Sequence, residues 1–153
     1  MIYIEYEELK QKYYEAQKKY DELLQEKEDL FAMTQPNSLS YDKEKVSGGK
    51  NDSPFDKYLI RKEQTKIEER LAEARINLAD RKVLTNLKQE ELEKSEHLHD
   101  KVYVRRYIER EKIKRIAREL MYSEPHIKRI LKQINTRLQK VRRDGEENSN
   151  DGE

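Results

Sequence analysis

The segment KIKRIARELMYSEPHIKRIL, from Lys112 to Leu131, contains two short helical patterns separated by a turn. The first pattern repeats small or branched apolar residues on one helical face, at Ile113, Ile116, Ala117 and Leu120. The small Ala117 falls where a second helix has to cross close to the first. The spacing therefore predicts a first helix that packs tightly against a second.

A turn of three residues, 121–123, is predicted between the two helices. Ser123 can cap the second helix by accepting a hydrogen bond from one of its free backbone N–H groups. Pro125 falls in the first turn of that helix, where its missing N–H costs little. Together these features predict a helix-turn-helix.

The second helix carries an apolar stripe at Ile127, Ile130, Leu131, Ile134 and Leu138. Its opposite face includes Arg129, Lys132 and Lys140, and it is the predicted DNA-reading surface. The candidate DNA-binding residues are Lys114, Arg115, Ser123, Glu124, Pro125, His126, Lys128, Arg129, Lys132, Gln133 and Thr136. The alternative interpretation is an ordinary all-α bundle in which a basic helix is merely solvated.

From Tyr107 to Leu131 the chain follows the pattern Y-I-E-x-x-K-I-K-x-I-A-x-E-L-x-Y-S-x-x-x-I-x-R-I-L. This pattern resembles the helix-turn-helix of sigma-factor region 4, especially in small phage and prophage transcriptional regulators of Gram-positive bacteria. The resemblance covers Leu98 to Val141 and implies a long charged helical region before a DNA-binding end. Met121 stands where the family usually has Gly, and a positive φ at a methionine costs about 1 kcal/mol.

The charge distribution agrees with the DNA-binding prediction. From Lys101 to Arg143 there are fifteen Lys or Arg and four Glu, a net charge of +11. Residues 1–100 carry a net −5, as does the tail from Asp144 to Glu153. The whole-chain net charge of +1 thus conceals a basic module between two acidic segments. Such a concentrated positive charge is typical of phosphate-binding surfaces.

Composition favours elongated helices over a large globular core. The chain has 153 residues, of which 34% are hydrophobic and 42% are charged. It has no cysteine, which fits a reducing compartment. No segment approaches the ~20 apolar residues that span a bilayer. We therefore expect no membrane partner and a location in the cytoplasm of a bacterial host cell.

The predicted fold class is all-α, with a long N-terminal helical hairpin or coiled coil followed by a small helix-turn-helix domain. In the first helix an apolar heptad pattern recurs at Tyr6, Leu9, Tyr13, Ala16, Tyr20, Leu23 and Leu30. The second helix has a stripe at Ile67, Leu71, Ala74 and Leu78, which can pair within one chain or between two. The expected segments are a heptad helix (1–33), a flexible linker (34–54), a second long helix (55–96), the helix-turn-helix domain (97–143) and an acidic disordered tail (144–153).

Catalytic chemistry is not expected from this sequence. His97 and His99 lie two residues apart, so on a helix their side chains diverge, and no Cys or third His accompanies them. No Ser-His-Asp set or Gly-rich phosphate loop is present. We therefore predict a non-enzyme without a cofactor.

Two functional classes remain. The first is a transcriptional regulator whose partners are double-stranded DNA, RNA polymerase and a second copy joined through the N-terminal helices. The second is a phage DNA-packaging protein, similar to a small terminase subunit, or another assembly protein that combines a helix-turn-helix with oligomerising helices.

Overall fold

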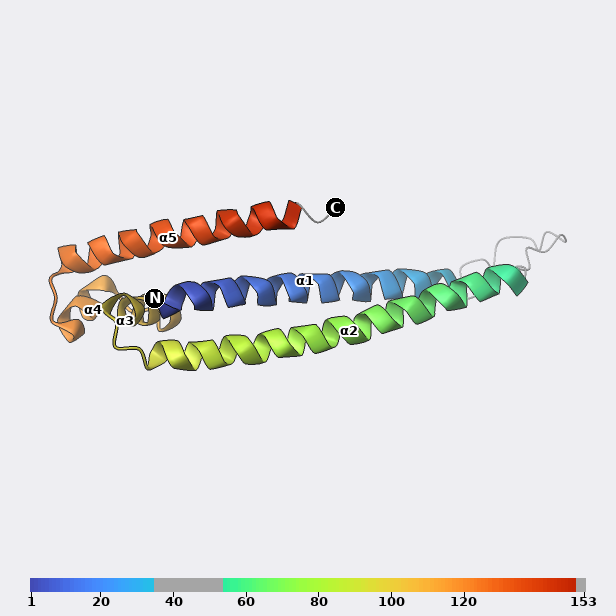
Figure 1. The fold of residues 1–153 in the computed structure, drawn as a ribbon, viewed down its shortest axis with the longest axis horizontal. Coiled ribbons are helices and arrows are strands. Elements are labelled where there is room, and N and C mark those ends of the chain that lie inside the picture. Colours follow the sequence, from blue (N-terminus) through green and yellow to red (C-terminus); the bar gives the residue numbers. More distant parts are fainter. Residues whose placement is uncertain (35–53, 151–153) are drawn as a thin grey trace, which may run out of the picture. The chain divides into compact units, whose positions relative to one another are not determined.

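The computed structural model describes residues 1–34 and 54–150, and every element in those ranges is helical (Figure 1). The all-α prediction is therefore confirmed for the described chain. The predicted linker over 34–54 falls almost wholly on 35–53, which lie outside the described residues. In chain order the elements are α1 (Ile2–Thr34), α2 (Pro54–Glu93), α3 (Leu98–Tyr103), the π-helical segment η2 (Val104–Ile108), α4 (Ile113–Leu120) and α5 (Glu124–Asn150).

The chain forms two compact units, and each long helix contributes to both. The first, here called the helix-turn-helix unit, contains residues 1–15 and 80–153. The second, here called the hairpin unit, contains residues 16–79. The helix-turn-helix unit therefore includes the start of α1 and the end of α2 in addition to the segment 97–143 expected from the sequence.

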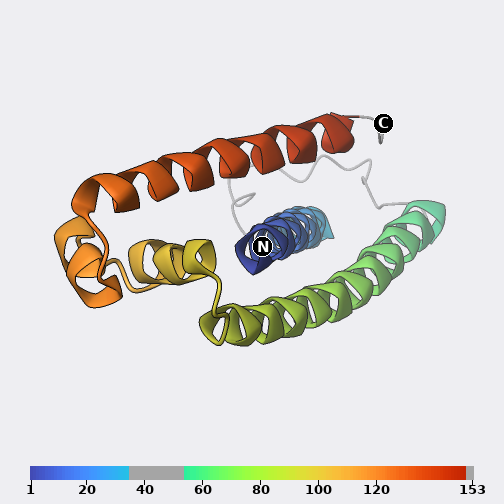
Figure 2. The same ribbon diagram turned by 60° about the vertical axis from the view of Figure 1, so that its left-hand side comes forward.

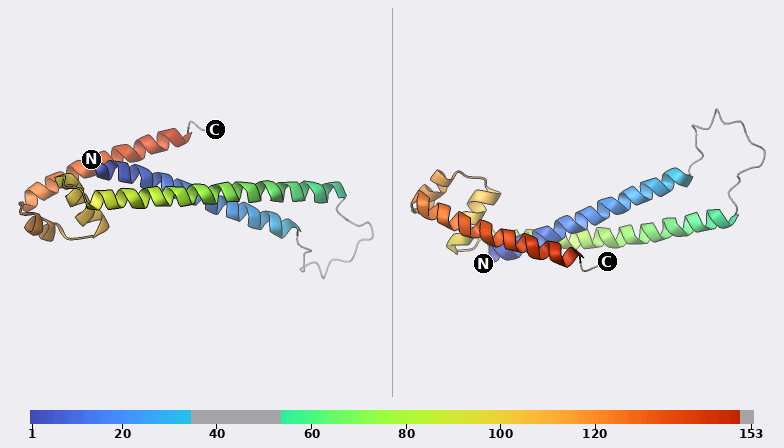
Figure 3. Two further views of the ribbon diagram at one scale, coloured as in Figure 1. Left: turned by 60° about the horizontal axis from the view of Figure 1, so that its bottom comes forward. Right: turned by 90° about the horizontal axis from the view of Figure 1, so that it is seen from above.

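In the hairpin unit, the second part of α1 packs against the first part of α2 (Figure 3). Its buried core is small and consists of Leu23, Ile67, Leu71 and Ala74. Three partly buried residues of α1 surround this core, namely Tyr20, Leu24 and Leu30. The apolar stripes predicted on the two long helices thus pair within one chain, as an antiparallel hairpin.

The helix-turn-helix unit has the larger core. All seven of the apolar residues Ile116, Ala117, Ile127, Ile130, Leu131, Ile134 and Leu138 are buried there, as their helical spacing predicted. The long helices add Tyr3, Tyr6 and Leu92 to the same core. Leu84 and Leu87 of α2 do not join this core and are 46% and 57% exposed. The core therefore combines the start of α1 and the end of α2 with α5 and the short helices.

Helix α5 extends further than its sequence pattern suggested. A disordered tail was expected from Asp144, whereas α5 continues to Asn150. Its second half packs near α1, since a Cβ atom added at Gly145 would lie 2.9 Å from the side-chain oxygen of Gln11.

Candidate nucleic-acid interface

The turn between α4 and α5 has the predicted length of three residues (Figure 2). Met121, the first of them, has φ 61° and ψ 38°, the left-handed conformation that glycine adopts most easily. The N–H of Tyr122 donates to the carbonyl of Ala117 at 3.0 Å and so closes the end of α4. The turn between α4 and α5 therefore has a methionine in a conformation that favours glycine.

The start of α5 is capped as its sequence predicted. The N–H of His126 donates to the Ser123 hydroxyl at a long 3.4 Å and to the Ser123 carbonyl at 3.1 Å. The rings of Tyr122 and His126 stack with their centroids 5.1 Å apart. These contacts fix the direction in which α5 leaves the turn.

Several candidate DNA-binding residues project outward from the core. Arg129 and Lys132 are exposed on the side of α5 opposite Ile127 and Ile130. Within the described part of the chain, the side chains of Lys114, Lys128, Arg129 and Lys132 take part in no ion pair or hydrogen bond, although the Lys132 carbonyl accepts from the Thr136 hydroxyl at 2.9 Å. The exposed candidates are Lys114, Arg115, Ser123, Glu124, Pro125, Lys128, Arg129, Lys132, Gln133 and Thr136, whereas His126 is half-buried.

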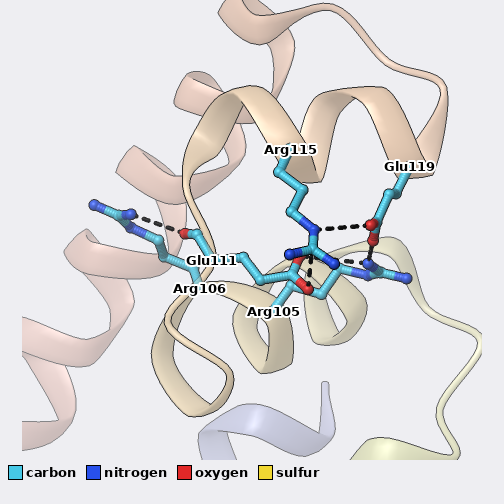
Figure 4. A network of polar contacts seen from close by, with 5 residues as sticks. All are labelled: Arg105, Arg106, Glu111, Arg115 and Glu119. Carbon is cyan, nitrogen blue, oxygen red and sulfur yellow. Dashed lines mark hydrogen bonds and ion pairs between the residues drawn. The ribbon is translucent and has the colours of Figure 1, made fainter.

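Arg115 differs from the other cations because it belongs to a charged cluster (Figure 4). Its Nε atom lies 3.0 Å from Glu119 and 3.9 Å from Glu111. Arg105 of η2 pairs with the same two carboxylates, and Arg106 donates to the Glu111 carbonyl at 3.0 Å. The cluster ties η2 to α4. A phosphate that approached Arg115 would therefore compete with two carboxylates.

Gln133 also has a partner that sequence reasoning missed. Its Oε1 atom lies 2.9 Å from Nε2 of His99, which must donate because an amide oxygen only accepts. Both amide N–H groups of Gln133 remain available to other acceptors. No local sequence signal could have found this pair, since its members are 34 positions apart.

Three stacked tyrosines, here called the tyrosine ladder, connect α5 to the start of α1. The ring of Tyr103 stacks on Tyr3 at 5.4 Å and on Tyr107 at 5.0 Å between centroids. Tyr107 donates from its hydroxyl to the side-chain oxygen of Asn135 at 2.8 Å. Burial, together with a hydrogen bond to Glu7, raises the pKa of Tyr103 far above its usual range. The ladder connects the start of α1 with the middle of α5.

The sequence predicted that the side chains of His97 and His99 diverge, but in the structure they lie close together. His97 has an extended backbone and precedes α3, so its ring lies 5.6 Å from that of His99. Across residues 1–34 and 54–150, no group of three or more His, Asp or Glu side chains could hold a metal ion. The same ranges contain no helix with the length and apolar character needed to cross a bilayer.

Comparison of the chain with family models, curated proteins and solved structures gives no match. Any functional interpretation therefore depends on the geometry and charge of the helix-turn-helix unit itself.

Proposed function

We propose that the protein is a sequence-specific DNA-binding transcriptional regulator of phage or prophage genes. One observation carries the proposal: a three-residue turn with a left-handed residue joins α4 to a helix whose outward face presents unpaired Arg129 and Lys132. In such motifs the N-terminal part of the second helix enters the major groove. The long helices would then serve in oligomerisation or in contact with RNA polymerase.

The expected division of roles follows from the position of each side chain. Arg129 projects from the outward face of α5, where a guanidinium can bind the O6 and N7 atoms of guanine. Lys114 lies near the start of α4 and is better placed for the phosphate backbone, where it adds affinity without sequence preference. The engagement of Arg115 by Glu119 makes it a weaker phosphate contact than Lys114.

A second function, DNA packaging or assembly, draws support from the hairpin unit. Phe55 and Tyr58 at the start of α2 are 66% and 60% exposed, and Leu59 is 42% exposed. Exposed apolar side chains of this size are typical of surfaces that associate. Solution mass discriminates the two functions, because a packaging ring contains many subunits and a regulator is a monomer or dimer.

Selection of binding sites from random duplex DNA by the full chain tests the proposal. On the selected site, Arg129→Ala should cost about 1–3 kcal/mol and relax the preference at one base pair. Lys132→Ala should also weaken binding. Lys62→Ala is the matched control, because it removes one exposed positive charge from the hairpin unit. If Arg129→Ala and Lys132→Ala bind like Lys62→Ala at every salt concentration, α5 is not the reading helix.

A further inference from the structure

Helix α5 carries positive charge well beyond the part that a helix-turn-helix uses for reading bases. With 27 residues it is about 40 Å long, whereas the major groove is about 12 Å wide. Its outward line continues from Arg129 and Lys132 through Thr136 to Lys140 and Arg143, in steps of three or four residues. All five side chains are exposed. They therefore form one straight ridge of about 21 Å.

The last two cations of this ridge have no partner among the described residues. No ion pair within 4.0 Å involves Lys140 or Arg143, although Asp144 and Glu147 each lie one turn further along α5. Neither cation supports the core, because α5 packs through Leu138 and the half-buried Val141 on its other side. Their charge is therefore free to bind an anion that approaches from outside.

We propose that Lys140 and Arg143 form a phosphate-contact strip on the same DNA duplex that the start of α5 reads. A straight helix follows a curved groove over only part of its length, so its far end meets the sugar–phosphate backbone. Arg143 lies on the same line as Arg129, so the strip faces the side of α5 on which the duplex is bound. This inference rests on the proposed function. The phosphate-contact strip would add affinity for DNA without sequence preference.

The ridge also has a defined end. Glu147 is the next residue on the outward line, one turn after Arg143, and a carboxylate there repels phosphate. The strip therefore stops at Arg143. Glu147→Gln should remove this repulsion and tighten binding to any duplex.

The sharpest test compares two adjacent arginines of the full-length protein. Arg143→Gln and Arg142→Gln remove the same charge at neighbouring positions, but only Arg143 belongs to the ridge, whereas Arg142 lies near Tyr107. Arg143→Gln should weaken binding to the selected and a scrambled duplex alike, by about fivefold at ~0.15 M salt, and lower the log–log salt slope by about 0.9. The double variant with Lys140→Gln should lower the slope by about 1.8. Arg142→Gln should change both quantities much less.

The outcomes separate this inference from the function on which it rests. If the wild-type chain shows no preference for any duplex, the proposed function fails first. If it binds selectively and Arg129→Ala loses that preference, but Arg143→Gln behaves like Arg142→Gln, only the phosphate strip is wrong. The phosphate-contact strip would also be wrong if the Lys140→Gln, Arg143→Gln double variant lost its base preference but kept the wild-type salt slope. That result would mean that these two residues read bases and do not contact phosphates.

Discussion

The backbone N–H of Tyr3 donates a 3.0 Å hydrogen bond to the Oδ1 atom of Asp100, and both residues are buried. The other oxygen of Asp100 accepts from the Ser95 hydroxyl at 2.7 Å. Tyr3 lies in the first turn of α1, whose N–H groups have no partner within the helix. Asp100 of α3 therefore caps α1 through the N–H of a residue 97 positions earlier in the chain, and its negative charge suits that helix end.

Asp100→Ala should lower the free energy of unfolding by about 2–4 kcal/mol, because it leaves a buried N–H and a hydroxyl without their acceptor. Asp100→Asn should cost less, since it retains one acceptor oxygen. Chemical denaturation of the full chain measures both changes. The control is Glu96→Ala, which removes a 90% exposed carboxylate paired with Lys101 and should cost little. Equal unfolding curves for Asp100→Ala and Glu96→Ala would show that this cap contributes nothing.

A second prediction concerns the segment 97–153 taken alone. It contains α4 and α5 but lacks Tyr3, Tyr6 and Leu92, which are all buried in the same core. Removing a single buried Leu or aromatic side chain costs about 2–5 kcal/mol, and a small domain has about 5–15 kcal/mol in total. We therefore expect the fragment to lack a cooperative thermal transition. A fragment that melts as sharply as the full chain would contradict this assignment of the core.

The sequence predicted the local parts of this structure better than the tertiary ones. Periodicity located α4, the turn and the buried face of α5, because each depends on neighbours within a few residues. The resemblance singled out Met121 as the residue where a positive φ would be costly, and Met121 does adopt the left-handed conformation. The burial of Tyr3 was missed, because a backward extension of the heptad from Tyr6 reaches Ile2, and no local pattern could specify the stacking of Tyr3 on Tyr103.

Polar partners were the least predictable part of the candidate interface. The pairing of Gln133 with His99, and of Arg105 with Glu119, depends on how η2 and α5 pack, which no spacing in the sequence reveals. The helical end of α5 was also missed, because the polar residues after Val141 show no apolar periodicity. Exposure of Arg129 and Lys132 was predictable, since both lie opposite a strong apolar stripe.

A third prediction uses the strained turn. Met121 is 92% exposed, so its side chain contributes no packing to lose. A left-handed conformation costs a non-glycine residue about 1–2 kcal/mol. Glycine avoids this cost, but it loses more conformational entropy on folding, which offsets part of the gain in stability. Met121→Gly should therefore raise the free energy of unfolding by about 0.5–1 kcal/mol, with Met121→Ala as the control that retains the strain. A lower stability for Met121→Gly would show that the turn is not strained.

The last prediction concerns stability at alkaline pH. Burial is the main cause that raises the pKa of Tyr103, and its hydroxyl also donates to Glu7. Below about pH 10 this phenol is neutral in both the folded and the unfolded chain, so its contribution to stability is fully present. Above that pH the unfolded chain ionises while the folded one stays neutral, and the free energy of unfolding falls by up to about 1.36 kcal/mol per pH unit. Burial also raises the pKa values of Tyr6 and Tyr107, which should add to the same loss.

Tyr103→Phe should therefore be less stable than the wild type at neutral pH, where it loses the bond to Glu7, yet lose stability less steeply above about pH 10. Denaturant titrations at a series of alkaline pH values measure the slope, and tyrosinate absorbance reports the ionisation directly. Tyr14→Phe is the control for the loss of a phenol, because Tyr14 is 57% exposed. An alkaline slope for Tyr103→Phe as steep as that of the wild type would mean that Tyr103 does not stay neutral in the folded chain.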